Sequence, residues 1–317
     1  MSKKINTIAI IGAGTMGMGI ATHFSIYGYT IHLFDAFPEA IEKAKTQIPS
    51  NYKSMLDLGE IDADQAKKGE EKVQYFSDLK AAVADADLVI ESVPENKELK
   101  KKIFDDLDGY CREDAILASN TSGLKIYDFL EVKNPERLVI THFFVPAYVM
   151  PLVEIVRGPE TSDETVAAVK ALMDATGKSP AVVNKVIPGF IMNRLTFAIY
   201  REGAYMVDQG WCAPEDIDSA VRATHGSRYP FEGPFELVDF AGVDTYEKIC
   251  ENLLPELCND SSVPKNLKDL FDKGDLGVKS GKGYFDYEDP TKSRAVRDRK
   301  IVKTIQSNRK IKDEFSD

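Results

Sequence analysis

The stretch THFFVPAYVMPLVEIV places His142 and Glu154 among mostly apolar residues. Burying an ionisable side chain is costly unless it has a partner, so we expect the two side chains to pair. Histidine titrates near neutral pH, and a carboxylate can fix its tautomer and stabilise the imidazolium that forms when it accepts a proton. The pair therefore indicates proton-transfer chemistry, against the plainer alternative that a single histidine in an apolar stretch is structural.

A glycine-rich segment near the start of the chain, GAGTMG, follows the order G-x-G-x-x-G. The residues of interest in it are Gly12, Gly14, Thr15, Met16 and Gly17. The spacing alone is weak evidence, but here it lies between an expected strand and an expected helix, where backbone can approach a pyrophosphate. Asp35 ends the next expected strand and would bind a ribose 2′-hydroxyl, and no arginine follows in AFPEA to receive a 2′-phosphate. The segment predicts dinucleotide binding, with NAD favoured over NADP.

Polar segments also follow two other expected strands, at the edge where ligands collect in open α/β sheets. ESVPEN contributes Glu95, which would contact a cofactor or serve as an N-terminal acid of the next helix. SNTS contributes Asn120 and Ser122, which could bind a nicotinamide or a substrate oxygen, or cap the following helix. Lys100, in KELKKK, belongs to what is most simply a solvated helix face, although one lysine there could meet a phosphate.

Short β-branched runs alternate with helical patterns over the first part of the chain, up to about residue 187. The alternation predicts an α/β fold with a mostly parallel, doubly wound sheet that helices cover on both faces. One long helix is expected from Pro38 to about Lys68. The strand signal then disappears, and PGFIMNRL opens a helix with Asn193 at its start, facing the cleft. We therefore expect a dinucleotide-binding domain over 1–187 and a helical domain over 188–317, whose last thirty residues form a surface helix or are partly disordered.

The composition excludes several classes of partner. A net charge of −11 argues against nucleic acid or an anionic membrane as the main partner, and no segment approaches the ~20 apolar residues of a membrane span. The four cysteines form no CxxC pair and no metal-ligand spacing, so we expect reduced thiols and no metal site. The basic and then apolar N-terminus has no cleavage-like site, which favours a cytoplasmic protein with a small-molecule substrate.

The sequence resembles the 3-hydroxyacyl-CoA dehydrogenase family along nearly the whole chain, through IAIIGAGTMGMGIA, ESVPEN, SNTSGL, LVEIV, PGFIMNRL and KSGKGYFDY. The resemblance implies a Rossmann domain, a helical domain that binds substrate and forms a homodimer, and NAD-linked oxidation of a β-hydroxyl in fatty acid metabolism. It makes His142 the general base and Glu154 the residue that orients it. It also sets Ser122 and Asn193 around the reacting oxygen, and Glu95 and Lys100 against the cofactor.

Several positions depart from the acyl-CoA members of that family. Val145 in HFFVP stands where they usually have asparagine, and Pro151 stands where they usually have lysine. The family's CoA-contacting lysine has no obvious match, although Lys53 is nearby. Arg228, in GSRYPFEGPF, is similar to the branch that contains gulonate and carnitine dehydrogenases, and could hold a free carboxylate or form an ion pair between helices.

Two substrate classes therefore stay open. Oxidation of a (S)-3-hydroxyacyl-CoA agrees with more of the chain, whereas oxidation of a free, small and polar β-hydroxy acid agrees with the departures. A third, remote alternative is a non-enzymatic protein that keeps the fold, as λ-crystallin does. The intact pair of His142 and Glu154 and the complete glycine loop argue against it.

Overall fold

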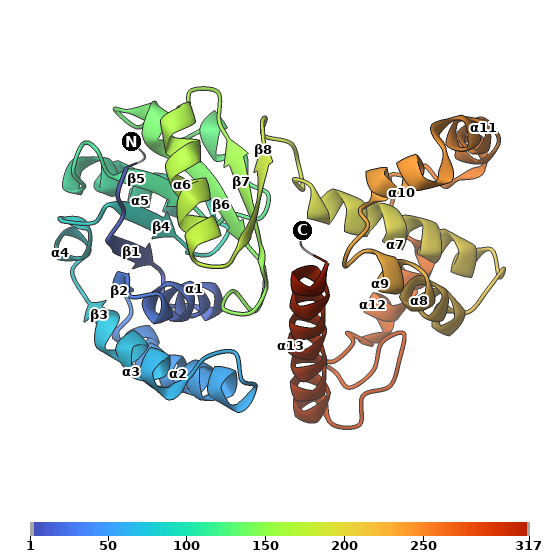
Figure 1. Ribbon diagram of the computed structural model, residues 1–317, viewed down its shortest axis with the longest axis horizontal. Helices are drawn as coiled ribbons and strands as arrows, with labels where there is room; N and C mark the ends of the chain where they lie inside the picture. The colour runs from blue at the N-terminus through green and yellow to red at the C-terminus, as the bar shows by residue number, and fades with distance from the viewer. Residues whose placement is uncertain (1–2, 316–317) are drawn as a thin grey trace. The chain divides into compact units, whose positions relative to one another are not determined.

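The computed structural model describes residues 3–315, which form two compact units (Figure 1). The first unit extends to Arg194 and the second begins at Leu195. Among residues 3–315, no helix combines the length and the apolar character that crossing a bilayer requires. All four cysteines are free thiols.

An eight-stranded sheet forms the centre of the first unit, with the strand order β3-β2-β1-β4-β5-β6-β7-β8. Neighbouring strands are parallel except for β6 and β7, which are antiparallel. The mostly parallel sheet predicted from the sequence is thus confirmed. The strands are β1 Thr7–Ile11, β2 Thr30–Phe34, β3 Val73–Phe76, β4 Leu88–Glu91, β5 Ile116–Ser119, β6 Leu138–Phe143, β7 Leu152–Arg157 and β8 Ser179–Val183.

Helices cover both faces of this sheet, as the alternation predicts (Figure 1). Successive side chains of a strand point to opposite faces, so Ile8 and Ile10 of β1 enter one apolar core and Ala9 and Ile11 enter the other. The first core is covered by α1 Thr15–Ile26, α2 Pro38–Asp57, α3 Ala63–Lys72 and α6 Asp163–Ala175. The second is covered by α4 Leu79–Val83 and α5 Lys97–Tyr110. Burying one such aliphatic side chain stabilises the fold by about 1.5–3 kcal/mol, so these cores hold the strand ends in place.

The single long helix expected from Pro38 to about Lys68 is wrong, because the chain forms two helices there. Helix α2 ends at Asp57, and Gly59 follows with a φ of +70°, a conformation that glycine adopts without strain. Asp62 then begins α3, since its side chain accepts a hydrogen bond from the backbone N–H of Gln65 at 2.8 Å.

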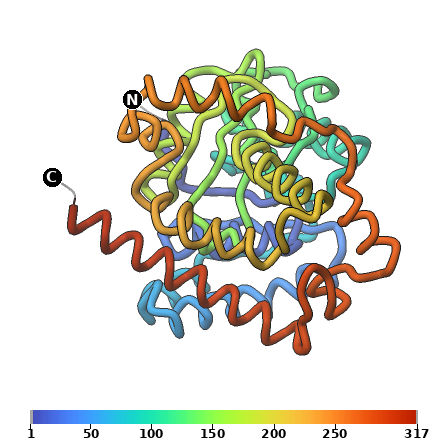
Figure 2. The backbone as a smooth tube through the Cα atoms, turned by 90° about the vertical axis from the view of Figure 1, so that its right-hand side faces the viewer, coloured from blue at the N-terminus to red at the C-terminus, as the bar shows by residue number. Residues whose placement is uncertain are grey.

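The second unit is helical, in agreement with the predicted loss of strand signal (Figure 2). Its helices are α7 Met192–Asp208, which starts three residues before the unit does, then α8 Pro214–Ala223, α9 His225–Arg228, α10 Pro234–Ala241, α11 Val243–Leu253, α12 Lys265–Lys273 and α13 Pro290–Glu314. Of the two alternatives for the last thirty residues, a helix is therefore correct over α13. The last two residues lie outside the described part of the chain.

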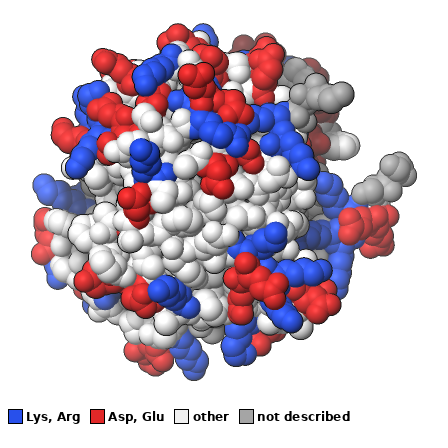
Figure 3. Space-filling model, turned by 90° about the vertical axis from the view of Figure 1, so that its left-hand side faces the viewer, with Lys and Arg blue, Asp and Glu red and all other residues white. Residues whose placement is uncertain are grey.

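Charges of both signs are interspersed on the face that Figure 3 shows, around a broad area without charged residues. The net charge of −11 is therefore not gathered into a single acidic field on this face.

Candidate active site

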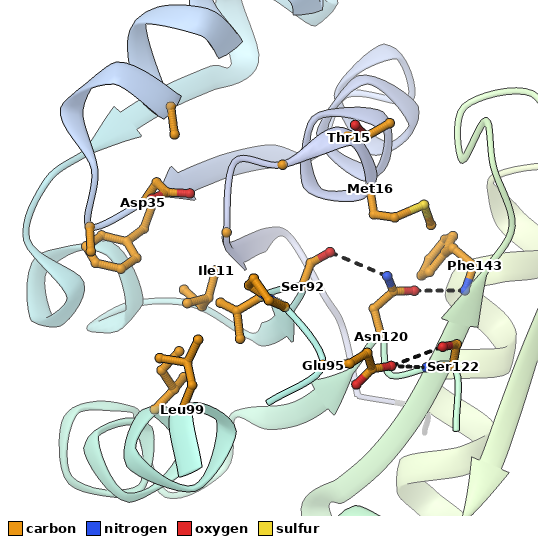
Figure 4. A pocket seen from close by; sticks show the side chains of 18 of the residues that line it. Ile11, Thr15, Met16, Asp35, Ser92, Glu95, Leu99, Asn120, Ser122 and Phe143 are labelled. Atoms are coloured by element: carbon orange, nitrogen blue, oxygen red, sulfur yellow. Dashed lines mark hydrogen bonds between the residues drawn. The ribbon is translucent and has the colours of Figure 1, made fainter. Parts of the chain in front are cut away.

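A cavity of about 610 Å³ opens at the carboxyl ends of the parallel strands (Figure 4). This is the edge at which open α/β sheets bind ligands. Every residue that lines the cavity belongs to the first unit. The lining includes most of the residues singled out from the sequence, namely Gly12, Gly14, Thr15, Met16, Asp35, Glu95, Asn120, Ser122 and His142.

The glycine loop joins β1 to α1, and each glycine meets a different steric condition. A Cβ atom on Gly12 would lie 2.7 Å from the carbonyl oxygen of Ser92, and one on Gly17 would lie 1.8 Å from the carbonyl oxygen of Gly12. A Cβ atom on Gly14 would have no neighbour within 4 Å, so this residue leaves open space. Gly17 is therefore needed for packing and does not line the cavity.

Helix α1 begins beside this open space with Gly14 as its N-cap, which contributes no capping side chain, and with no acid in its first turn. The first backbone N–H groups of a helix lack partners within it and carry the positive end of the helix dipole. This terminus thus suits an anionic group, and the absence of a Cβ atom at Gly14 lets a pyrophosphate come close.

Asp35 follows β2 and lies across the glycine loop. Its carboxylate accepts a hydrogen bond from the N–H of Ala13 at 2.8 Å through Oδ2 and one from the N–H of Phe37 at 3.0 Å through Oδ1. An oriented acid here suits a ribose hydroxyl. No lysine or arginine of residues 3–315 lines the cavity to receive a 2′-phosphate, which fits NAD.

The sequence did not predict one apolar part of the lining, formed by Phe34, Phe37, Ala40, Leu99 and Ile103. These side chains come from β2, α2, α5 and the loop before α2, and could hold an adenine ring. The one signal in the sequence for this part of the lining was Phe37, an aromatic residue just after Asp35. In the structure Phe37 is 70% exposed.

The side chain of Asn120 connects the ends of three strands through two hydrogen bonds, as Figure 4 shows. Its Oδ1 accepts a hydrogen bond from the N–H of Phe143 at 2.9 Å, and its Nδ2 donates to Ser92 Oγ at 3.4 Å. Because these residues follow or end β4, β5 and β6, the side chain fixes the floor of the cavity.

Glu95 holds the SNTS loop. Its carboxylate accepts hydrogen bonds from Thr121 Oγ1 at 2.9 Å, from the N–H of Ser122 at 2.6 Å and from Ser122 Oγ at 3.1 Å (Figure 4). The next residue, Asn96, is the actual cap of α5. Burial alone would raise the pKa of Glu95, but the N–H of Ser122, the charge of Lys100 and the two hydroxyls together hold that pKa below its ordinary value.

Lys100 does not lie on a solvated helix face, and that interpretation is wrong for this residue. It is 1% exposed, and its Nζ lies 2.6 Å from Glu91 Oε1 and 3.6 Å from Glu95 Oε2. Lys97 and Lys102 of the same run are exposed. The ammonium group of Lys100 is not part of the cavity lining, so its contact with a cofactor stays a prediction.

His142 and Glu154 lie directly opposite each other in the antiparallel pair of β6 and β7. The Nδ1 atom of His142 is 2.8 Å from Glu154 Oε2, and both side chains are buried. Glu154 Oε1 accepts hydrogen bonds from the backbone N–H groups of Ile191 and Met192, at 2.9 and 2.8 Å. The pairing expected from the sequence is therefore present in the structure.

This arrangement fixes the tautomer of the histidine. Burial raises the pKa of Glu154, but the hydrogen bonds from His142, Met192 and Ile191 outweigh it, so the pKa lies below its ordinary value. An ionised carboxylate only accepts hydrogen bonds, so Nδ1 of His142 donates. The Nε2 atom of a side chain that lines the cavity is then left free to accept a proton.

The other expected site residues lie outside the cavity lining. Asn193 is the second residue of α7 and is half-buried. Arg228 ends α9 in the second unit, where it is exposed and forms no ion pair with the residues described there. Val145 does line the cavity, with 55% of its surface exposed.

Comparison with known proteins finds relatives along nearly the whole chain. The model of the NAD binding domain of 3-hydroxyacyl-CoA dehydrogenase matches residues 7–186, and the model of the C-terminal domain of that enzyme matches residues 189–287. A 5-formyl-3-hydroxy-2-methylpyridine 4-carboxylate 5-dehydrogenase of Mesorhizobium japonicum is 37% identical over 301 residues, covering 94% of this chain and 96% of that protein. A probable 3-hydroxybutyryl-CoA dehydrogenase of Bacillus subtilis is 37% identical over 290 residues, covering 91% of this chain and 99% of that protein.

A solved structure resembles this chain along nearly its whole length. The crystal structure of a 5-formyl-3-hydroxy-2-methylpyridine 4-carboxylic acid 5-dehydrogenase, described as an NAD⁺ dependent dismutase, superposes with a TM-score of 0.88. It is 35% identical and covers 96% of this chain and 99% of its own. The cofactor is NAD, and this chain belongs to the 3-hydroxyacyl-CoA dehydrogenase family of NAD-dependent oxidoreductases.

Proposed function

We propose that this protein oxidises a hydroxyl group to a carbonyl group, with His142 as the general base. The observation that supports it is the 2.8 Å hydrogen bond from His142 Nδ1 to a buried carboxylate, which leaves Nε2 to take the hydroxyl proton. Glu154 stabilises the imidazolium that results. NAD, when bound, supplies the acceptor for the hydride that leaves the same carbon.

The other expected residues have distinct roles in this proposal. Ser122 and Asn193 hydrogen-bond the reacting oxygen. The cofactor is held by Gly12, Gly14, Thr15, Met16, Gly17, Asp35, Glu95, Lys100 and Asn120, with Gly17 and Lys100 acting through packing and charge because neither lines the cavity. Replacing Asp35 with alanine should weaken NAD binding about tenfold and relax the preference over NADP, and an unchanged ratio of the two affinities would refute the ribose role.

For the substrate, we propose a small free carboxylate in preference to a CoA thioester. The dehydrogenase with the TM-score of 0.88 acts, by its description, on a free pyridine carboxylate. The match covers 96% of the chain, and the missing 4% of 317 residues is about 13, fewer than the 25 residues of α13. Part of α13 therefore has a counterpart in that protein, although α13 lies beyond the family match that ends at residue 287.

Two side chains agree with that choice. Val145 gives the cavity an exposed apolar group where an amide could hydrogen-bond a thioester substrate. Lys53, the one candidate for a contact with CoA, is engaged in an ion pair with Asp57 one turn away, at 2.8 Å. The thioester remains the second candidate, because both domains match the family model and the relative from Bacillus subtilis is described as an acyl-CoA enzyme.

The test is NAD reduction by the purified protein with three substrates at equal concentration. They are (S)-3-hydroxybutyryl-CoA, free 3-hydroxybutyrate and 5-formyl-3-hydroxy-2-methylpyridine 4-carboxylate. The formyl group of the last must first add water, because only its hydrate carries a hydroxyl and a hydrogen on the carbon that loses hydride, and the product is then a carboxylic acid. A preference for either free acid supports the proposal, and a preference for the thioester overturns it. The variant Arg228→Ala should raise KM for a free acid and leave KM for the thioester nearly unchanged, whereas an equal loss on both would make Arg228 structural. His142→Gln should abolish turnover of whichever substrate is used.

We further propose that the second unit forms a homodimer. Among residues 195–315 the only buried hydrophobic residues are Ala204, Cys258 and Val302, which is too small a core for a unit of this size. Phe235 and Phe240 are 85% and 83% exposed, and large apolar surfaces of this kind mark protein interfaces.

Light scattering on the purified protein tests this proposal. We expect a mass of twice 35.2 kDa, and expect Phe235→Ser to shift it toward the mass of one chain. Tyr110→Ser, which removes an exposed aromatic residue of the first unit, is the matched control. A wild-type protein that stays at 35.2 kDa at micromolar concentration would overturn the proposal.

A further inference from the structure

A second buried acid lies behind the cavity. Glu91, the last residue of β4, is completely buried and does not line the cavity. Its Oε1 accepts hydrogen bonds from Lys100 Nζ at 2.6 Å and from the N–H of Val93 at 2.8 Å, and its Oε2 accepts one from Ser119 Oγ at 2.6 Å. An ionised carboxylate at a buried position is costly unless hydrogen-bond donors surround it, and Lys100, Val93 and Ser119 supply those donors to Glu91.

Two chains of contacts lead from Glu91 to Ser122. The first passes through Lys100, whose ammonium group lies between Glu91 and Glu95, and Glu95 accepts hydrogen bonds from the N–H and the hydroxyl of Ser122. The second passes through Ser119, whose Oγ accepts a hydrogen bond from the N–H of Thr121 at 3.2 Å. The position of Ser122 on the cavity wall thus depends on Glu91 from both sides.

The distances indicate what the charge on Glu91 does. Lys100 Nζ is 2.6 Å from Glu91 and 3.6 Å from Glu95, so the ammonium group is hydrogen-bonded to Glu91 and forms a longer ion pair with Glu95. It also donates to the carbonyl oxygen of Val93 at 3.4 Å. Without the charge on Glu91, the buried ammonium group would have Glu95 as its one remaining carboxylate partner. Glu95 would then turn from Ser122 toward Lys100, because a buried cation must be paired.

We propose that Glu91 is a positioning residue of this enzyme, which takes the short hydrogen bond of Lys100 and so leaves the Glu95 carboxylate to hold Ser122 in place for the reaction. The proposal rests on the proposed function, in which Ser122 binds the reacting oxygen. Glu91 itself touches neither substrate nor cofactor.

The experiment compares Glu91→Gln with Asp87→Asn. Asp87 precedes the same strand at its other end, and is likewise a buried acid that accepts two backbone N–H groups and an arginine, Arg112. Both variants should lower the melting temperature. Only Glu91→Gln should lower kcat, by about 10- to 100-fold, since a displaced reaction partner costs up to ~10²-fold in rate. Asp87→Asn should leave kcat within about twofold.

A double-mutant cycle with Ser122→Ala separates positioning from general damage. In the Glu91→Gln background, Ser122→Ala should lower kcat by less than about threefold, because Ser122 is already displaced. In the Asp87→Asn background it should have its full effect. Multiplicative losses in both backgrounds, or a Glu91→Gln enzyme with wild-type kcat, would overturn the proposal.

Two further variants cover the cases in which Glu91→Gln does not fold or the proposed function itself is wrong. If Glu91→Gln does not fold, Ser119→Ala removes one of the two contact chains without leaving a charge unpaired, and should show a smaller loss of kcat with the same lack of additivity. If His142→Gln keeps its turnover, the proposed function fails. The cycle can still be measured on the substrate that is turned over, so the two failures are distinguishable.

Discussion

Replacing Glu154 with glutamine tests the orientation of the base most directly. The carboxylate uses both oxygens, one for His142 Nδ1 and the other for the backbone N–H groups of Ile191 and Met192. A glutamine has the same shape but only one acceptor oxygen. If that oxygen keeps the two backbone N–H groups, the amide NH₂ faces Nδ1, which must then accept, and the proton of the imidazole moves to Nε2. The nitrogen that should take the substrate proton is then blocked.

The structure sets the size of this effect. The competent tautomer would require the amide to flip, which turns its NH₂ group against two buried backbone donors. Each buried donor left without an acceptor costs about 1–3 kcal/mol, so the flip costs about 2–6 kcal/mol. At 1.36 kcal/mol for each factor of ten, the competent form is reduced roughly 30- to 10⁴-fold. This range overlaps the ~10²–10⁴-fold that general base catalysis contributes, and we expect kcat to fall by at least about 30-fold.

The assay is the steady-state rate of NADH formation, together with NAD binding in the absence of substrate. Because Glu154 does not line the cavity, NAD affinity should stay within about twofold of the wild-type value. Glu164→Gln, on the exposed surface of α6, is the matched control for the change from acid to amide. A Glu154→Gln enzyme that folds normally and retains kcat within about threefold would refute the argument, because His142 would then not depend on the carboxylate for its tautomer.

Two further predictions concern the cofactor loop and acid stability. Gly17→Ala should destabilise the protein by about 1–3 kcal/mol, because its Cβ atom would lie 1.8 Å from the carbonyl oxygen of Gly12, whereas Gly14→Ala should keep the melting temperature and weaken NAD binding. Equal melting temperatures for the two variants would contradict this assignment. Arg112 donates the hydrogen bonds that, with those from Lys3, hold the pKa of Asp114 at about 2, below its usual 3.8. Such a group stabilises the fold above pH 3.8 and loses that contribution as the pH falls toward about 2, so Arg112→Met should unfold at a higher pH in an acid titration followed by circular dichroism. The variant also removes the ion pair of Arg112 with Asp87, so an unchanged midpoint would mean that neither ion pair of Arg112 contributes.

The strands and the glycine loop could be predicted because their signals are local. A β-branched run that stops at glycine, as NTIAII does before Gly12, specifies a buried strand and the turn after it within a few residues. The pairing of His142 with Glu154 was also within reach, because two ionisable residues in one apolar stretch need each other. The break between α2 and α3 was not, because apolar residues on both sides keep the helical spacing and only Gly59 and Asp62 signal the interruption.

Lys100 shows where local patterns stop being informative. KELKKK contains four lysines, and their spacing alone does not indicate which of them faces the sheet. The structure buries Lys100 because Glu91, at the end of β4, supplies a carboxylate beneath α5. The apolar lining near Phe37 was missed for a similar reason, since it combines residues from several elements that only the strand order brings together.

The chemistry of the site depends on the one antiparallel pair in the sheet. Parallel neighbours need long crossover connections, whereas β6 and β7 are joined by a short loop and can face each other residue by residue. This register sets Glu154 directly opposite His142, near the carboxyl end of β6 and the beginning of β7. The base thus reaches the edge where the parallel strands β1, β2, β4 and β5 present the cofactor cavity, while its carboxylate partner enters from a strand of opposite direction. Glu91 and Ser119 show that parallel strands can also bring two polar side chains together, but only from their carboxyl ends. The change in strand direction at β7 instead lets a carboxylate from the beginning of a strand reach the histidine near the end of its neighbour.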